Sequence, residues 1–139
     1  MKASSTGERM TDKRLVKDGL RYTADHEWVK VEDGNVRMGI TDHAQHQLTE
    51  IVFVELPKVG KKVQRGDVIG QVESVKTVAS VYAPVSGEVV EVNQNLEDST
   101  QLLNESPYDQ GWFAVIRMDD PSAPEKLLDP TAYRKVLEG

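Results

Sequence analysis

Lys76 lies between two apolar stretches, within the sequence GQVESVKTV of residues 70–78. This pattern predicts a β-hairpin whose turn carries the lysine, so that its long stem would hold the amine away from the backbone. An enzyme that joins a carboxylic acid to an amine needs such access. Most surface lysines stay unmodified, so the spacing alone leaves both a modified and an unmodified lysine open.

Three histidines are the other side chains with chemical capacity. His43 and His46 are spaced i, i+3 on a predicted helix, a spacing that can chelate a metal. A short exposed helix lacks the outer hydrogen-bonding groups that metal sites need, so we predict no metal there. His26 and Glu27 precede Trp28 and are interpreted as a polar edge of the core. No phosphate-binding loop, nucleophile elbow or paired acid and base is present, so we predict no catalytic residue.

The composition restricts the classes of function. The chain has 139 residues, no cysteine and a formal net charge of -6. Without cysteine, disulfides, thiolate zinc sites and a cysteine nucleophile are excluded, and dithiol chemistry must come from a cofactor. The acidic balance argues against nucleic acid and anionic membranes as partners. No apolar run approaches the roughly 20 residues that cross a bilayer.

The first residues of the chain are set apart from the rest. Residues 1–10 contain no apolar segment typical of a secretory signal. We expect residues 1–13 to be a disordered leader or a remnant of cloning, and residues 14–139 to form a single domain.

Glycine and proline divide the middle of the chain into short strands, a pattern typical of a β-barrel or β-sandwich. Residues 28–31 and 36–40 alternate between inward and outward positions around the turn sequence EDGN, which predicts a hairpin. A short helix is predicted after Ile40, with Asp42 as its N-cap and Gln45 in the capping-box position.

A weak internal repeat follows. Residues 57–63 and 84–90 share the form P-x-x-G-x-x-V. Two similar halves favour two interlocked sets of strands related by a pseudo-twofold axis. Chance is the alternative, because proline and glycine are common in β-rich chains.

The last part of the chain predicts a strand and then a helix. Residues 112–118 are apolar and β-like, and Asp129 followed by Pro130 is a typical helix start. The apolar stripe of that helix, formed by Tyr133, Val136 and Leu137, is expected to pack on the barrel.

Six ordered blocks of sequence resemble the lipoyl-carrying H proteins of the glycine cleavage system. The block around the lysine is ESVK, formed by Glu73, Ser74, Val75 and Lys76, and it matches the family's lipoylation signature. The other blocks are YTADHEW, GITDHAQ, VELP, APVSGEV and NESPY, at residues 22–28, 39–45, 54–57, 83–89 and 104–108. Biotin carriers of similar fold centre on M-K-M, which this chain lacks. The resemblance runs from about residue 20 to residue 138.

The resemblance implies a mainly β fold, the barrel-sandwich hybrid of lipoyl and biotinyl carriers, with the short inserted helix and the C-terminal helix. It implies that lipoate is the cofactor, joined covalently to Lys76 by an amide. Glu73, Ser74 and Val75 would form the motif that the attaching enzyme recognises. Glu27 would line the cleft in which the loaded arm rests, with Trp28 as an apolar wall.

The role implied by the resemblance is that of a non-catalytic carrier in glycine catabolism and one-carbon metabolism. It would carry an aminomethyl group from the P protein (glycine decarboxylase) to the T protein (aminomethyltransferase). It would present its dithiol to the L protein (dihydrolipoyl dehydrogenase). The lipoyl-attaching enzyme is a fourth partner. We expect a bacterial cytoplasmic location in preference to a mitochondrial matrix.

Two other functions remain open. One is a lipoyl relay for lipoate assembly, which would use the same fold and lysine. The other is a structural barrel that is never modified. The chain also departs from the family at Ser80, four residues after the lysine, where many H proteins have an acid. This departure puts in doubt a carboxylate that would face the arm from that position.

Overall fold

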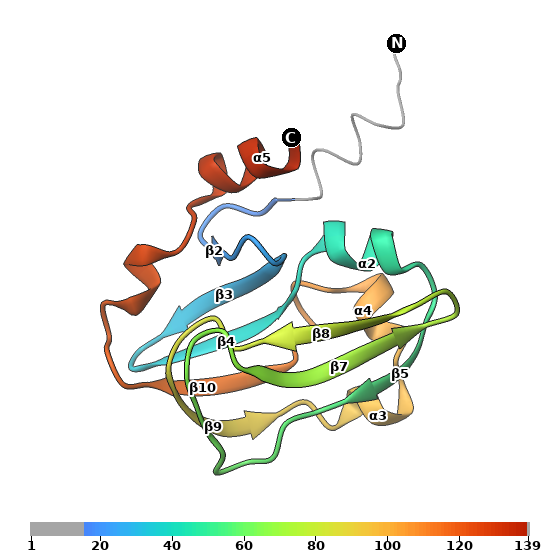
Figure 1. Cartoon of the computed structure of the whole chain (residues 1–139), viewed down its shortest axis with the longest axis horizontal. Helices are drawn as coiled ribbons and strands as arrows, with labels where there is room; N and C mark the ends of the chain where they lie inside the picture. The colour runs from blue at the N-terminus through green and yellow to red at the C-terminus, as the bar shows by residue number, and fades with distance from the viewer. Residues whose placement is uncertain (1–15, 139) are drawn as a thin grey trace.

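The computed structural model describes residues 16–138 as two β-sheets with short helices around them (Figure 1). The expected leader at residues 1–13 lies outside this range, and the extent of the domain stays a prediction. No helix in the described range is long and apolar enough to cross a membrane.

Most strands follow one another directly along the chain, and the helices stand between or after these runs of strands. The strands are β2 (Arg21–Tyr22), β3 (Glu27–Glu32), β4 (Asn35–Ile40), β5 (Ile51–Glu55), β6 (Lys62–Val63), β7 (Val68–Ser74), β8 (Val78–Tyr82), β9 (Gly87–Val92) and β10 (Ala114–Met118). The helices are α2 (Asp42–Leu48), α3 (Asn95–Asp98), α4 (Leu102–Glu105), the 3-10 helix η1 (Ala123–Lys126) and α5 (Pro130–Glu138).

The core lies between the two sheets. The larger sheet has the strand order β2-β3-β4-β10-β9-β6, and the smaller has the order β5-β7-β8. Apolar side chains of both sheets form one buried cluster, which includes Met38 and Ile116 of the larger sheet and Val54, Val72 and Val81 of the smaller. The predicted mainly β fold, with a short inserted helix and a C-terminal helix, is confirmed.

The hairpin of β3 and β4 is present, with Asp33 in the left-handed region (φ 59°) at its turn. The predicted alternation is wrong at its first strand, because adjacent Trp28 and Val29 are both buried whereas Val31 is 51% exposed. Val29 faces the core between the sheets, and Trp28 packs on the opposite face in a second apolar cluster. Burial on both faces at one end of a strand removes the simple period of two.

The inserted helix α2 is present after Ile40 as predicted, but it begins one residue earlier than a cap at Asp42 would place it. Thr41, not Asp42, is the N-cap, because its extended backbone ends β4 and its hydroxyl accepts a hydrogen bond from the Ala44 amide at 3.2 Å. Asp42 lies in the first turn of the helix, where its carboxylate accepts a 2.9 Å hydrogen bond from Gln45 Nε2. A carboxylate in this turn also opposes the positive end of the helix dipole.

The two copies of the repeat pair with each other. In the antiparallel pairing of β6 with β9, Lys62 faces Glu88 and Val63 faces Gly87, and Gly60 N–H donates to the Val89 carbonyl at 2.7 Å. This arrangement supports a local twofold relation between the copies. A Cβ at Gly87 would lie 2.0 Å from the Arg117 carbonyl oxygen, so the close approach of β10 requires glycine there.

Helix α5 covers the β2 edge of the larger sheet (Figure 1). Asp129 caps it as predicted, accepting a 2.8 Å hydrogen bond from the Ala132 amide. Tyr133 is buried and stacks on Tyr22 with 4.4 Å between ring centroids. Val136 is exposed, so the predicted stripe is narrower than expected.

Candidate functional site

Lys76 lies at the tip of the β7–β8 hairpin and is exposed, as the sequence predicted. The Ser74 amide donates to the Thr77 carbonyl at 2.8 Å and closes the turn. The Val75 amide donates to the Glu50 carbonyl at 3.0 Å, which ties the turn to the residue before β5. The backbone under the lysine is therefore fixed while the amine faces solvent.

Ser74 shapes this turn from inside. Its side chain is buried, and its hydroxyl oxygen accepts hydrogen bonds from the amides of Lys76 and Thr77, each at 3.1 Å. The hydroxyl also donates to the Thr77 carbonyl at 3.2 Å. Serine hydroxyls commonly bond to backbone a few residues on, a signal that sequence reasoning could have used here. Of the predicted recognition residues, Glu73 and Val75 are exposed and Ser74 is not.

A cleft of about 310 Å³ lies beside the same two strands. One wall is helix α2 and the other is the β7–β8 hairpin, and the lining is mainly apolar. The lining residues that bear on the argument are Glu27, His43, Leu48, Val72, Ala79 and Ser80. Strands β7 and β8 therefore display Lys76 at their tip and line the cleft with residues nearer their middle. Ser80 of β8 is one of these lining residues.

Glu27 is 2% exposed at the start of β3, so it is not an ordinary surface acid. Its Oε1 accepts a 2.7 Å hydrogen bond from the Thr23 hydroxyl, and its Oε2 accepts one from the Tyr82 amide at 3.1 Å. Burial raises the pKa of this carboxyl to about 7, against the lowering effect of these two bonds. A carboxyl in this position titrates near neutrality and keeps lone pairs for a further donor.

Two histidines stand at the cleft beside Glu27. The rings of His26 and His43 are 4.5 Å apart, and His26 Nδ1 shares a 2.8 Å hydrogen bond with the Tyr133 hydroxyl. Burial, and then the neighbouring imidazole, lower the pKa of His26, and the same kinds of cause lower that of His43. Sequence reasoning missed this pair, although the predicted hairpin of β3 and β4 supplies a signal for it: Glu27 pairs with Ile40, which brings the residues just outside the hairpin together.

The helical spacing of His43 and His46 does not produce a chelating pair. His43 packs on His26, whereas His46 Nε2 lies 3.8 Å from Asp42 Oδ2. Among residues 16–138, no group of three or more histidine, cysteine or acidic side chains is placed to hold a metal ion.

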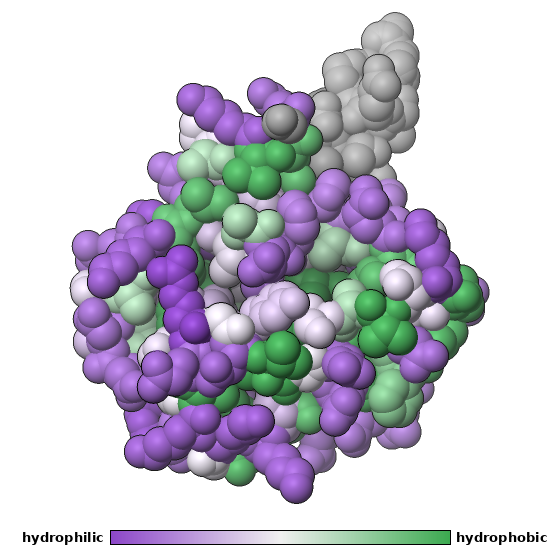
Figure 2. Space-filling model, viewed as in Figure 1, coloured by the Kyte–Doolittle hydropathy of each residue, from purple (hydrophilic) through white to green (hydrophobic). Residues whose placement is uncertain are grey.

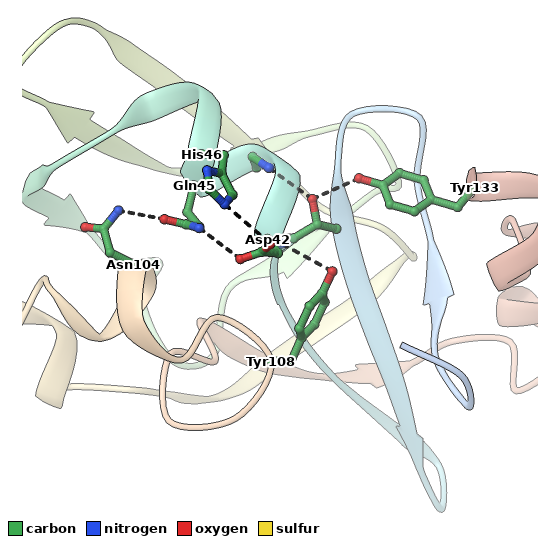
Figure 3. Close-up of polar contacts among 8 residues, drawn as sticks. Asp42, Gln45, His46, Asn104, Tyr108 and Tyr133 are labelled. Atoms are coloured by element: carbon green, nitrogen blue, oxygen red, sulfur yellow. Dashed lines mark hydrogen bonds and ion pairs between the residues drawn. The ribbon is translucent and has the colours of Figure 1, made fainter. Parts of the chain in front are cut away.

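A polar network holds helix α2 in place as the cleft wall (Figure 3). Asn104 donates to Gln45 Oε1 at 2.9 Å and to the Thr49 carbonyl at 2.7 Å, and its own oxygen accepts from the Ile51 amide at 3.0 Å. The Asp42 amide donates to the Tyr108 hydroxyl at 3.2 Å. The NESPY block therefore supports the cleft from outside it, a role that no local sequence signal indicated.

Trp28 is not part of the cleft, contrary to the expectation that it forms an apolar wall. Its indole N–H donates to the Pro107 carbonyl at 2.9 Å, and its ring packs in the second cluster on the other face of β3. Neighbouring residues of a strand point to opposite faces, so Glu27 and Trp28 cannot line the same surface. The apolar walls come instead from Leu48, Val72 and Ala79.

Comparisons with known proteins all match this chain to the same family. The family model described as "Glycine cleavage H-protein" matches residues 20–139. A probable glycine cleavage system H protein of Thermococcus gammatolerans is 56% identical over 125 residues, which are 88% of this chain and 92% of that protein. The glycine cleavage system H protein of Kocuria rhizophila is 50% identical over 121 residues, which are 86% of this chain and 94% of the relative.

A solved structure is similar over nearly the same extent. The crystal structure of a glycine cleavage system H protein from Mycobacterium marinum superposes with a TM-score of 0.82 and 38% sequence identity. The match covers 89% of this chain and all of the other.

Proposed function

Because the chain belongs to the glycine cleavage H-protein family, which carries a lipoyl group within the glycine cleavage system, we propose that Lys76 is its lipoylated residue. The observation that carries the proposal is the exposure of Lys76 at a hairpin tip whose backbone is fixed by Ser74 and Glu50. An attaching enzyme needs an accessible amine and a rigid backbone to recognise.

The residues present fit a lipoyl arm. Lys76 would hold the arm through an amide, and the apolar cleft beside β7 and β8 suits a short hydrocarbon chain with a sulfur ring at its end. When bound, the group supplies the disulfide and dithiol that receive and release the aminomethyl cargo. Glu73 and Val75 would be read directly by the attaching enzyme, and Ser74 would act through the shape of the turn.

The cleft provides shelter for an amine-bearing cargo. Its mainly apolar walls exclude water, which is one way in which a protein suppresses hydrolytic side reactions. Glu27 would accept charge-assisted hydrogen bonds from the cargo's amine on lone pairs that Thr23 and Tyr82 leave available. A cation at this point would favour the ionised carboxylate and lower the pKa of Glu27 from about 7. Ser80 offers only a hydroxyl at the cleft. The two acids of the lining are Glu27, which is buried, and Asp25, which is exposed, so Glu27 would be the acid that meets the cargo away from water.

The chain itself would be non-catalytic, and would supply position and local concentration to the enzymes that it visits. Its proposed partners are the P, T and L proteins and the lipoyl-attaching enzyme. The bacterial and archaeal sources of its relatives support a cytoplasmic location.

The test begins with the protein produced in a host that makes lipoate. Intact mass and peptide mapping should find one lipoyl group, on Lys76. Lipoyl on Lys58, Lys61 or Lys62, or on no residue, would contradict the proposal. The lipoylated protein should then support glycine–bicarbonate exchange with P protein, and failure there would favour the lipoyl-relay alternative.

A further inference from the structure

Four exposed apolar side chains surround the tip of the β7–β8 hairpin. They are Val52 (46% exposed), Phe53 (56%), Val75 (64%) and Val78 (54%), and we refer to them as the tip patch. Figure 2 shows hydrophobic residues gathered at the right of the view, over the end of this hairpin and the adjoining β5. Single exposed apolar residues are ordinary, whereas a cluster of them marks a surface for interaction.

Strand pairing makes the tip patch continuous. Phe53 pairs with Glu73 across β5 and β7, and Glu73 pairs with Val78 across β7 and β8. Directly paired residues share a face, and neighbouring strands are about 4.8 Å apart, so the two apolar side chains flank Glu73 within roughly 10 Å. An irregularity in β5 between Ile51 and Phe53 leaves Val52 exposed as well.

The charges around the tip patch are of one sign, apart from Lys76. Glu50, Glu55 and Glu73 are exposed, and Lys76 is the only basic residue in segments 50–56 and 71–80. A complementary partner would therefore offer an apolar depression with an arginine- or lysine-rich rim.

We infer that the tip patch is the docking surface of the enzyme that acylates Lys76, a protein with an apolar depression and a basic rim at its active-site mouth. The inference rests on the proposed modification of Lys76. The acylating enzyme must bring its reacting groups to the bare amine, which stands only one lysine stem beyond the backbone. Its surface therefore has to lie on the residues around that backbone. Enzymes that act at the far end of a lipoyl arm do not face this requirement.

The test compares a double variant with a matched control. Phe53→Ser with Val78→Ser removes two of the four apolar side chains of the tip patch, those that flank Glu73, whereas Val59→Ser changes an exposed valine in the loop between β5 and β6. Initial rates are followed by intact mass, with purified lipoate–protein ligase, lipoate and ATP and the full chain as substrate. We expect the double variant to raise KM about tenfold or more with little change in kcat, because docking and not chemistry is altered. The KM of the control should stay within about twofold of that of the unaltered chain. Because the docking surfaces carry opposite charges, the KM of the unaltered chain should also rise with salt.

Three results would overturn the inference. An unchanged KM in a folded double variant, checked by thermal melting, overturns the inference. So does a result in which the unaltered chain sediments as a dimer and the double variant as a monomer, because the tip patch would then be a contact between copies. The fully lipoylated double variant should be reoxidised by L protein at the rate of the unaltered chain. If the rate of reoxidation falls as much as the rate of attachment, the tip patch is not specific to the acylating enzyme and the inference is overturned. If the unaltered chain accepts no lipoyl group at all, it is the proposed function that has failed.

Discussion

The hairpin tip and the Glu27 cleft share strands β7 and β8 but are built in opposite ways. At the tip the backbone is fixed by Ser74 and Glu50 while the Lys76 side chain is exposed. In the cleft the side chain itself is fixed, because Glu27 is buried and hydrogen-bonded to Thr23 and Tyr82. Attachment requires access to a side chain, whereas shelter requires that water be kept from one, so one pair of strands can serve both needs at different points.

Two glutamates, one in each region, differ in the same way. Glu73, three residues before the lysine, is exposed on the outer face of the smaller sheet. Glu27 is buried, and that burial raises the pKa of its carboxyl to about 7. The identical side chain is therefore exposed to an approaching protein in one place and enclosed in a cleft, with a raised pKa, in the other. Changes at the two regions should have separable effects.

The largest expected effect is at the tip. Lys76→Arg keeps the positive charge but removes the amine that can be acylated, so lipoylation should fall to zero by intact mass. Lys76→Ala should lose it equally, yet change the free energy of unfolding by no more than about 0.5 kcal/mol, because the side chain is exposed. A large fall in melting temperature would mean that the tip is structural, and the contrast with the cleft would be lost.

The next effect concerns the pH dependence of stability in the cleft. Because the pKa of Glu27 rises on folding from 4.5 to about 7, the folded state holds its proton more tightly than the unfolded state. This contribution is complete below pH 4.5 and is lost as pH rises through 7, by up to about 3 kcal/mol. Glu27→Gln stays neutral, so its stability relative to the unaltered chain should increase between pH 5 and pH 8.

Denaturant unfolding at several pH values measures this difference. The lowered pKa values of His26 and His43 give a slope of opposite sign, but it is present in both proteins and cancels in the comparison. Glutamine cannot accept from both Thr23 and Tyr82, so a pH-independent loss of about 1 kcal/mol is expected as well. Parallel curves for the two proteins would show that Glu27 does not titrate in this range.

The third effect tests the shelter directly. Glu27→Ala should shorten the lifetime of the aminomethyl-loaded protein about tenfold, because one charge-assisted hydrogen bond and part of the water exclusion are removed. The loaded form is followed by mass spectrometry after P protein is withdrawn. Lipoylation and reoxidation by L protein should be unchanged in the same variant. Equal lifetimes would mean that the shelter lies elsewhere.

Sequence reasoning was more successful at the tip than at the cleft, and the physical reason is locality. The hairpin, its turn and the exposed lysine follow from a contiguous pattern of apolar and turn residues. The cleft is assembled from β3 and α2 on one side and β7–β8 on the other, which are distant in sequence, so its apolar walls could not be foreseen. The His26–His43 pair flanks the predicted hairpin of β3 and β4 and was overlooked. Glu27 was predicted there only through the family resemblance.

The errors in the fold prediction have the same origin. Trp28 was expected beside Glu27, and the burial of both faces at the start of β3 became visible only with the second cluster in place. The N-cap was predicted at Asp42 and is Thr41, because the extended backbone of β4 continues through Thr41 and the helix begins at the next residue. Both cases are tertiary constraints that override a local preference.

A smaller effect distinguishes the backbone of the tip from its side chains. Ser74→Ala removes the acceptor for the Lys76 and Thr77 amides, and should lower the free energy of unfolding by about 1–2 kcal/mol. Amide exchange at both residues should accelerate. Thr77→Ala, an exposed position in the same turn, is the control and should change stability little. Similar exchange rates in both variants would show that the turn is held by its strands alone.

The smallest effect is expected at Glu73, where the comparison with Glu27 is sharpest. Glu73 is exposed and lies between Phe53 and Val78, so Glu73→Ala should slow lipoylation a few-fold through KM and weaken its dependence on salt. Glu91→Ala, at an exposed glutamate of the other sheet, should have no such effect. Unchanged kinetics would identify Glu73 as a solvated strand residue. If both regions work as argued, Glu73→Ala impairs attachment and spares the loaded form, and Glu27→Ala does the reverse.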